Sequence, residues 1–181
     1  VAAGASKFAT DKQTTPTAAV RESIGNGLAQ EELSLDAAVR AEDSINSSLR
    51  LLHTGLGCHV AALLWYDEEG NRLVLRDAVG QTESLARNVH PGEGALAGVL
   101  RRREPVHIQS LRSSYRGLTY YRNTNPGPVR NFLGVPVMEN DSDEARVLGV
   151  LCLDRASDAP FDASAEGLAL DAAGAIVRAM T

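Results

Sequence analysis

Lysine, cysteine and long apolar runs are scarce in this chain of 181 residues. Its two lysines, Lys7 and Lys12, lie near the start, so arginine supplies the basic charge elsewhere. No apolar run reaches the roughly 18 residues that a membrane-spanning helix needs, which argues against a spanning segment in this sequence. Acidic residues outnumber basic ones by 23 to 18, which argues against a general nucleic-acid-binding protein.

The two cysteines, Cys58 and Cys152, match no zinc, thioredoxin or disulfide spacing. Both stand in apolar, strand-like surroundings, where a free thiol packs as a small hydrophobic group. This use of cysteine is typical of a reducing, cytoplasmic setting. The chain opens without Met and its last helical pattern runs to the final residues, so we expect a piece of a longer parent protein. A membrane anchor elsewhere in that parent is compatible with this piece.

The stretch from Asn131 to Asp154 is the most informative part of the sequence. It contains two apolar runs, NFLGVPVM and RVLGVLCLD, around a polar turn. Both faces of each predicted strand are apolar. In the first strand, one face carries Leu133, Val135 and Val137, and the other carries Phe132, Gly134 and Met138. In the second strand, one face carries Val147, Leu151 and Leu153, and the other carries Leu148, Val150 and Cys152. A strand that is apolar on both faces must be covered on both faces.

We expect an N-terminal extension over residues 1–33 and one domain over residues 34–181. Residues 1–16 show no hydrophobic periodicity, which is typical of a poorly ordered terminus. The pattern then predicts a short helix over residues 17–32, weakened by Gly25 and Gly27.

The segment after residue 33 predicts a long amphipathic helix. Ser34 is a candidate N-cap, and Gly55 and Gly57 can end the helix. Glu42 interrupts an apolar stripe that is otherwise formed by Leu35, Val39, Ile45, Leu49, Leu52 and Leu56. A stripe this narrow suits a helix–helix seam as well as packing on a sheet, and the pattern leaves both open.

The remaining elements alternate strands with turns. Strands are predicted over residues 59–66, 72–79 and 106–109, and a short helix over 94–103. A long irregular loop follows from Ser110 to Arg130, and Pro136 predicts a bulge or a missing strand partner. A closing helix after Pro160 has its apolar positions at Leu168, Ala172, Ala175, Ile176 and Ala179. Because neighbours joined by short turns pair antiparallel, the order predicts an α+β domain.

Three stretches in this order resemble a GAF domain, a small-molecule sensor module related to PAS domains. They are VAALLWYDEEGNRLVLRDAVG, VHPGEGALAGVLRRREPVHIQSL, and the segment that runs from FLGVPVM to DAAGAI. The resemblance covers roughly Ala38 to Met180. It implies a central antiparallel sheet of about five or six strands, with the N- and C-terminal helices on one face. Loops or short helices would lie over a ligand pocket on the other face.

The resemblance also implies a role in a signalling protein. The expected partners are a small-molecule ligand, a second copy that pairs through the terminal helices, and a covalently linked output domain. That output domain would be of the kinase, cyclase or transcription-activator type. No nucleic-acid partner is expected.

The ligand classes of this family can be compared with these residues. The cyclic-nucleotide signature includes a lysine, whereas Lys7 and Lys12 both lie upstream of the domain. Bilin attachment requires a cysteine in or near the loop, but Cys58 and Cys152 lie in the sheet region. The methionine sulfoxide reductases of the family use loop cysteines, and residues 94–130 contain none. The resemblance therefore implies a non-catalytic sensor, with the cofactor or ligand unknown.

The loop from Ser110 to Arg130 is the candidate ligand site. Planar guanidinium groups bind phosphate or carboxylate, and aromatic rings stack on heterocycles. The residues proposed to bind an anionic or nucleotide-like ligand are Trp65, Arg112, Tyr115, Arg116, Tyr120, Tyr121, Arg130 and Phe132. The alternative is a solvated basic loop whose tyrosines cap the core. Asp154 and Arg155, which end the last predicted strand, could orient a ligand, but a turn or a local ion pair is the favoured interpretation.

Two functions therefore remain in view. In the first, a ligand bound under the loop shifts the packing of the terminal helices, and an output domain responds. In the second, the domain is a ligand-free dimerisation or protein-interaction module, with the pocket filled by Trp65, Tyr121 and Phe132. Catalysis is disfavoured because the sequence lacks a nucleophile, base and metal ligands as sets. The histidines are isolated, with no spacing typical of a metal site.

Overall fold

A computed structural model describes the backbone of residues 18–140, 142 and 144–180, and the side chains of these ranges from residue 34 onward. Six strands form one antiparallel sheet in the order β3-β2-β1-β6-β5-β4. They are β1 (Val60–Asp67), β2 (Arg72–Gly80), β3 (Asn88–Val89), β4 (Val106–Ile108), β5 (Asn131–Met138) and β6 (Val147–Arg155). The helices are α1 (Ala18–Leu56), α2 (Gly94–Arg102) and α3 (Ala163–Met180). The predicted α+β architecture is confirmed. The expectation for residues 1–16 lies outside the described residues.

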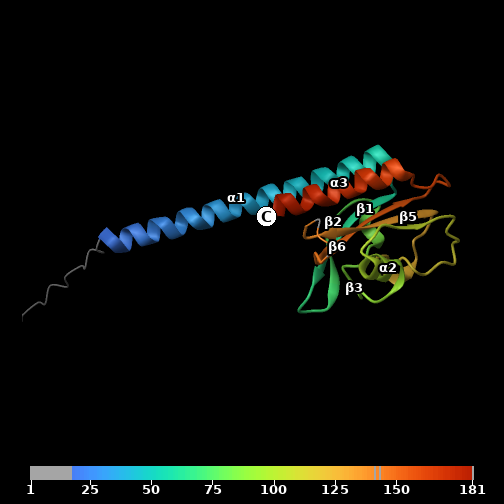
Figure 1. Cartoon of the computed structure of the whole chain (residues 1–181), viewed down its shortest axis with the longest axis horizontal. Coiled ribbons are helices and arrows are strands. Elements are labelled where there is room, and N and C mark those ends of the chain that lie inside the picture. The colour runs from blue at the N-terminus through green and yellow to red at the C-terminus, as the bar shows by residue number, and fades with distance from the viewer. Residues whose placement is uncertain (1–17, 141, 143, 181) are drawn as a thin grey trace, which may run out of the picture. The chain divides into compact units, whose positions relative to one another are not determined.

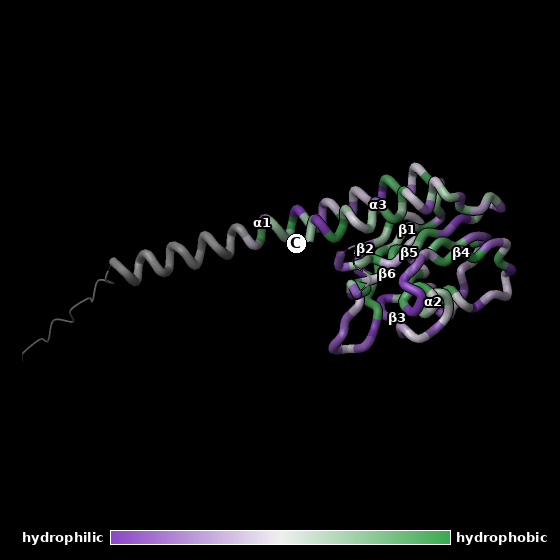
Figure 2. The backbone as a smooth tube through the Cα atoms, in the orientation of Figure 1, coloured by the Kyte–Doolittle hydropathy of each residue, from purple (hydrophilic) through white to green (hydrophobic). Residues whose placement is uncertain are grey.

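Two hydrophobic clusters cover the two faces of the sheet, as the apolar strands require. One cluster joins α1 and α3 to the sheet through Ile45, Leu49, Ala169, Ile176 and their neighbours. The other joins α2 and the loop after β4 to the opposite face, through Leu96, Val99, Leu118 and their neighbours. Figure 1 shows α3 on one side of the sheet and α2 on the other. In Figure 2 the sheet is largely hydrophobic, and the tip of the β1–β2 hairpin is hydrophilic.

The predicted faces are confirmed for Phe132, Leu133, Val135 and Val137 of β5, whereas Val147 and Leu148 of β6 lie on the faces opposite to those predicted. Leu133, Val135 and Val137 pack on the helix side, and Phe132 packs on the opposite side. Leu148 also packs on the helix side, together with Leu151 and Leu153. The reason is a bulge: Val137 pairs with Gly149 and Met138 with Val147, so Leu148 is an extra residue in β6.

Pro136 has a strand partner on only one side, as predicted. It pairs with Val150 of β6, whereas β4 pairs only with Phe132, Leu133 and Gly134. The strand β4 therefore ends before it reaches the residue that has no N–H to donate. The sequence did not indicate β3, whose two residues pair with Leu73 and Val74 of β2.

The prediction of a helix start at Ser34 is wrong, because α1 runs without a break from Ala18 to Leu56. Gly25 and Gly27 lie inside it, and each glycine costs about 1 kcal/mol relative to alanine. A helix that has already formed tolerates this cost, since extension adds a hydrogen bond per residue without a new nucleus. Contacts divide the chain into residues 1–37 and residues 38–181, and the second unit contains the whole sheet.

Glu42, the acid in the stripe of α1, has a specific partner in β2. Its carboxylate pairs with the guanidinium of Arg76, and one turn later Asn46 Nδ2 donates to Asp77 Oδ2 at 3.0 Å. A bulge makes both contacts possible, because Leu63 pairs with Asp77 and Leu64 with Leu75, which leaves Arg76 as the extra residue. The bulge therefore directs two consecutive side chains of β2 towards α1.

The buried face of α3 differs from the predicted stripe. Ala165, Ala169, Ala173, Ile176 and Val177 are buried against the sheet. Small side chains allow α3 to approach the strands closely, and this advantage outweighs the larger Leu168, which is 50% exposed. Of the predicted stripe, Ile176 is buried, while Leu168, Ala172 and Ala175 line a groove beside α1.

Candidate functional site

Residues 110–130, which we call the flap, cover the face of the sheet opposite α1 and α3. Leu111, Leu118 and Val129 are buried in the same cluster as Leu96 and Val99 of α2. The flap also contacts the start of α2, where Ala95 N donates to the carbonyl of Gly117 at 2.8 Å. At Gly94, with φ +62°, a Cβ would lie 2.2 Å from that same carbonyl, so this close approach requires glycine. The structure thus places the flap where the sequence predicted a lid.

Two tyrosines of the flap reach into the sheet and meet a buried carboxylate. The hydroxyls of Tyr120 and Tyr121 donate to Asp154 Oδ2 at 2.5 and 2.7 Å. The other oxygen, Oδ1, accepts from the backbone N–H of Val60 at 3.1 Å. Phe132, which pairs with Asp154 in the sheet, packs against Tyr120 with 5.9 Å between ring centroids. The space beneath the flap is therefore filled by the protein's own side chains at this point.

Burial controls the ionisation of this cluster. Desolvation raises the pKa of Asp154 to about 6, although the two tyrosine hydroxyls and the Val60 N–H counteract part of that effect. Desolvation and the nearby carboxylate also raise the pKa of both tyrosines well above the ordinary value. The hydroxyls therefore stay protonated at neutral pH and remain hydrogen-bond donors.

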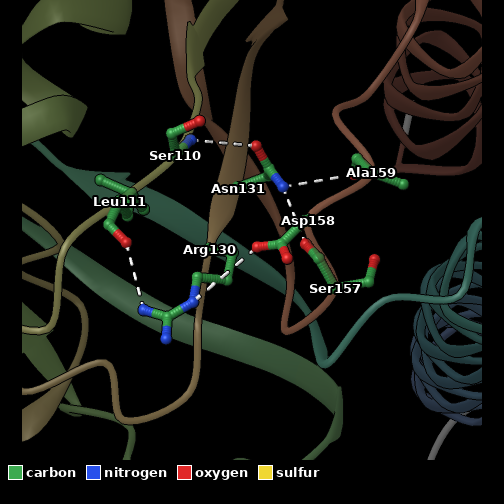
Figure 3. A network of polar contacts seen from close by, with 7 residues as sticks. All are labelled: Ser110, Leu111, Arg130, Asn131, Ser157, Asp158 and Ala159. Atoms are coloured by element: carbon green, nitrogen blue, oxygen red, sulfur yellow. Dashed lines mark hydrogen bonds and ion pairs between the residues drawn. The ribbon is translucent and has the colours of Figure 1, made fainter.

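The two ends of the flap are tied together and to the segment that precedes α3 (Figure 3). Leu111 N donates to the carbonyl of Arg130 at 2.7 Å, and Arg130 Nη1 donates back to the carbonyl of Leu111 at 3.3 Å. The buried side chain of Asn131 accepts from Ser110 N at 3.3 Å and donates to the carbonyl of Ser157 at 2.8 Å. These contacts fix the base of the flap and leave its middle to be positioned by the tyrosines.

The proposed ligand-binding residues fall into four places. Tyr120, Tyr121 and Phe132 are buried beneath the flap. Arg112, Tyr115 and Arg116 line an outer groove that also includes Ile108. Arg130 lies at the base of the flap, with Nε 4.0 Å from the carboxylate of Asp158. Trp65 packs with the cluster under α1 and α3, on the opposite face of the sheet. The structure does not bring these eight residues into one pocket.

The interpretation of Asp154 as part of a turn or of a local ion pair is wrong. The side chain is fully buried and accepts hydrogen bonds from two tyrosines, while the neighbouring Arg155 donates to the carbonyl of Leu56 at 2.8 Å. A signal for this existed in the sequence. Asp154 shares the strand parity of Val150 and Cys152, which face the flap.

The described residues contain few groups suited to catalysis. Both cysteines are free and buried, as predicted, and burial raises the pKa of Cys58 to about 12. Such thiols stay protonated, whereas the thiolate is the nucleophilic form. No group of three or more His, Cys, Asp or Glu among the described residues could hold a metal ion. Among these same residues, no helix is both long and apolar enough to cross a lipid bilayer.

A second candidate surface lies on the opposite side of the sheet, between α1 and α3. An apolar groove of about 330 Å³ is lined there by Leu51, Leu52, Leu56, Leu168, Ala172 and Ala175, together with Ser48, Gly55 and Asp171. Leu51 is 71% exposed and Leu168 is 50% exposed, although both are large apolar side chains. An apolar surface of this kind on a helix pair is typical of a contact with another protein surface.

A family model for the GAF domain matches residues 40–180, which is most of the chain and includes all six strands. The chain belongs to the GAF family. The recognition made from the three sequence stretches is thus confirmed. GAF domains are generally regulatory modules that sense small molecules. No curated protein matches the chain.

Solved GAF structures share the fold at low sequence identity. The GAF domain of a phosphoenolpyruvate-protein phosphotransferase from Acinetobacter is 21% identical, with 82% of this chain and 92% of that chain covered and a TM-score of 0.61. A GAF/HD domain protein from Geobacter sulfurreducens is 18% identical, with coverage of 77% and 91% and a TM-score of 0.61.

A free methionine-R-sulfoxide reductase from Neisseria meningitidis, solved with its substrate, is also similar. It is 18% identical, with coverage of 80% and 83% and a TM-score of 0.61. At these identities the likeness shows the GAF fold alone, so an enzymatic relative does not assign an activity to this domain. Both cysteines of this GAF domain lie outside the flap.

Proposed function

We propose that this GAF domain is a non-catalytic regulatory module that pairs with a second copy through α1 and α3. In this proposal, a small anionic ligand changes the contacts between the sheet and these helices. A covalently linked output domain of the kinase, cyclase or transcription-activator type then responds to the change in the helices. The observation that carries the proposal is the exposed apolar groove between α1 and α3.

The helix pair supports this role because it has two apolar sides. One side of α1 is buried on the sheet through Ile45, Leu49 and Leu52. Other apolar residues, including Val39 and Leu51, are more than half exposed. Burial of exposed apolar surface against an equivalent surface stabilises a symmetric dimer. The sequence pattern was compatible with α1 packing on the domain core and with α1 packing on a second copy. A helix with two apolar sides is compatible with both arrangements.

The pairing is tested by charge substitutions in the groove. The variants Leu51→Asp and Leu168→Asp place a carboxylate in the proposed interface, and each should weaken the dimer by at least about tenfold in dissociation constant, because the buried charge would lose its hydration. The matched control is Leu170→Asp, an exposed leucine of α3 that lines a different groove near Pro136. Sedimentation velocity over a range of concentrations measures the result. A wild-type domain that stays monomeric at every concentration would contradict the proposal.

A second candidate function is a ligand-free interaction module, and one observation favours it. The interior of the flap is occupied by Tyr120, Tyr121 and Phe132, and both oxygens of Asp154 already have partners. A ligand beneath the flap would have to displace these groups. Differential scanning fluorimetry with a panel of small anions distinguishes the candidates, since ligand binding to the folded state raises the melting temperature.

A further inference from the structure

Three arginines from separate parts of the chain line one groove at the β2 edge of the sheet. Arg76 comes from β2, Arg87 from the segment before β3, and Arg122 from the flap. The groove has a volume of about 420 Å³, and its other lining residues are Leu75, Asp77, Ala78, Thr82 and Leu85. No pattern in the sequence groups Arg122 of the flap with Arg76 and Arg87.

The guanidinium groups of this arginine groove are only partly occupied. Arg122 donates through Nε to the carbonyl of Leu85 at 2.9 Å, which holds its terminal nitrogens at the groove. Arg87 makes no side-chain hydrogen bond or ion pair within the described residues. Arg76 pairs with Glu42 through one terminal nitrogen. Each guanidinium carries five N–H donors, so most donors in the groove have no acceptor within the part of the protein that the structure describes.

The one carboxylate in the lining does not neutralise these arginines. Asp77 Oδ2 accepts from Asn46 Nδ2 at 3.0 Å, and Oδ1 accepts from the N–H of Ala78 at 2.7 Å. Its side chain is therefore engaged towards α1 and towards its own backbone. The lining carries three positive charges and one negative charge, on a chain whose net charge is −5. The groove is therefore positively charged on a chain that is negatively charged overall, and this local positive potential attracts anions.

We propose that the arginine groove binds a small multivalent oxyanion, of the phosphate or carboxylate type. Guanidinium groups bind such anions through paired, charge-assisted hydrogen bonds, and three of them can surround one anion from different sides. The groove is open to solvent and needs no displacement of the tyrosines beneath the flap. Leu75, Ala78 and Leu85 add an apolar part to the lining.

Anion binding here would compete directly with Glu42 for Arg76. That pair is about half exposed on both sides, with 45% of the Arg76 side chain and 49% of the Glu42 side chain accessible. Exposed ion pairs are weak, so a dianion held by Arg87 and Arg122 can draw Arg76 away from α1. The bound anion therefore removes one of the polar contacts between β2 and α1. Binding itself does not depend on whether α1 and α3 pair with a second copy.

Isothermal titration calorimetry of the whole chain at low salt tests the site, with pyrophosphate as the phosphate probe and citrate as the carboxylate probe. The variant Arg87→Ala should weaken binding by at least about tenfold, because it removes a guanidinium that has no structural partner. The matched control is Arg112→Ala, an exposed flap arginine that lines the outer groove instead and removes the same charge. It should change the affinity by less than about twofold.

The variant Glu42→Gln tests the competition. Without its carboxylate partner, Arg76 is available to the anion, so pyrophosphate should bind about two- to fivefold more tightly than to the wild-type chain. An unchanged affinity in this variant overturns the competition. Equal losses in Arg87→Ala and Arg112→Ala, or no binding of either probe, overturn the site itself. A chain that binds anions but stays monomeric contradicts the dimer and leaves this inference supported.

Discussion

At the scale of single residues, Asp154 is the group whose surroundings matter most. It is the penultimate residue of β6 and is fully buried, yet it accepts three hydrogen bonds, two from tyrosine hydroxyls and one from the N–H of Val60. Burial disfavours the ionised form, and the donors compensate only in part. The net result is a pKa of about 6 for this carboxyl group. Asp154 thus links the flap to the centre of the sheet at some cost in stability at neutral pH.

This cost predicts a pH dependence of stability. The carboxyl group is protonated in both the folded and unfolded states well below pH 4, and ionised in both well above pH 6. Between these values the folded state binds more protons, so the free energy of unfolding should fall as the pH rises from about 4 to about 6. The raised pKa corresponds to about 3 kcal/mol. Urea denaturation at several pH values measures the free energies of unfolding of the wild type and of Asp154→Asn, and hence how the difference between them depends on pH.

The control for this experiment is Asp158→Asn, whose side chain is 97% exposed. The difference between the free energies of unfolding of this variant and of the wild type should stay nearly constant over the same pH range. If the difference between the wild type and Asp154→Asn were also constant, the buried carboxyl group would not titrate as its surroundings indicate.

At the scale of elements, glycines and bulges decide how closely strands and helices approach. Gly149 of β6 lies where a Cβ would be 2.3 Å from the backbone carbonyl of Leu64 in β1. Next to it, the bulge at Leu148 turns a leucine towards the helix face. Gly167 of α3 is the opposite case, because a Cβ there would meet nothing within 4 Å.

These two glycines predict opposite effects of alanine. Gly149→Ala should lower the free energy of unfolding by about 1–3 kcal/mol, because the strands would have to move apart. Gly167→Ala should raise it by about 0.5–1 kcal/mol, since alanine restricts the unfolded chain and favours the helix. Guanidinium denaturation measures both values. Two shifts of the same sign would show that the local space around these residues is not what decides the effect.

The elements themselves were largely predictable from local pattern. The two-sided apolar runs identified β1, β5 and β6, and a sheet that must be covered twice followed from them. The short β3 was missed, because two residues carry no periodicity. The Leu148 bulge and the start of α1 were also missed. The bulge depends on long-range strand pairing, and the start of α1 depends on the cost of nucleating a second helix. Neither can be recognised from local composition.

At the scale of the whole molecule, the two faces of the sheet carry different surfaces. The helix face presents the apolar groove between α1 and α3, and the opposite face presents the flap with its buried tyrosines. The Glu42–Arg76 and Asn46–Asp77 contacts connect the β2 edge to α1. On the other edge, His107 Nε2 of β4 lies 2.5 Å from Glu166 Oε2 of α3. β2 and the edge strand β4 are therefore both joined to the terminal helices by polar pairs.

The proposed dimer predicts that thermal stability depends on protein concentration. If the second copy binds only the folded domain, mass action should raise the melting temperature when the concentration increases from about 1 µM to about 100 µM. A gain of a few degrees is expected for a domain of this size. Differential scanning calorimetry of the wild type and of Leu51→Asp measures it. A concentration-independent midpoint in both chains would count against pairing through the groove.

The order of the elements and the two covered faces of the sheet could be predicted without coordinates, because they follow from periodicities within single elements, and three stretches in that order resembled the GAF family. Only the tertiary structure decided that Asp154 meets Tyr120 and Tyr121, that Trp65 lies on the face away from the flap, and that Arg76, Arg87 and Arg122 share one groove. The physical reason is that sheet register and bulges set which distant side chains meet. A single displaced residue in a strand changes the face of its side chain, and local composition does not record that displacement.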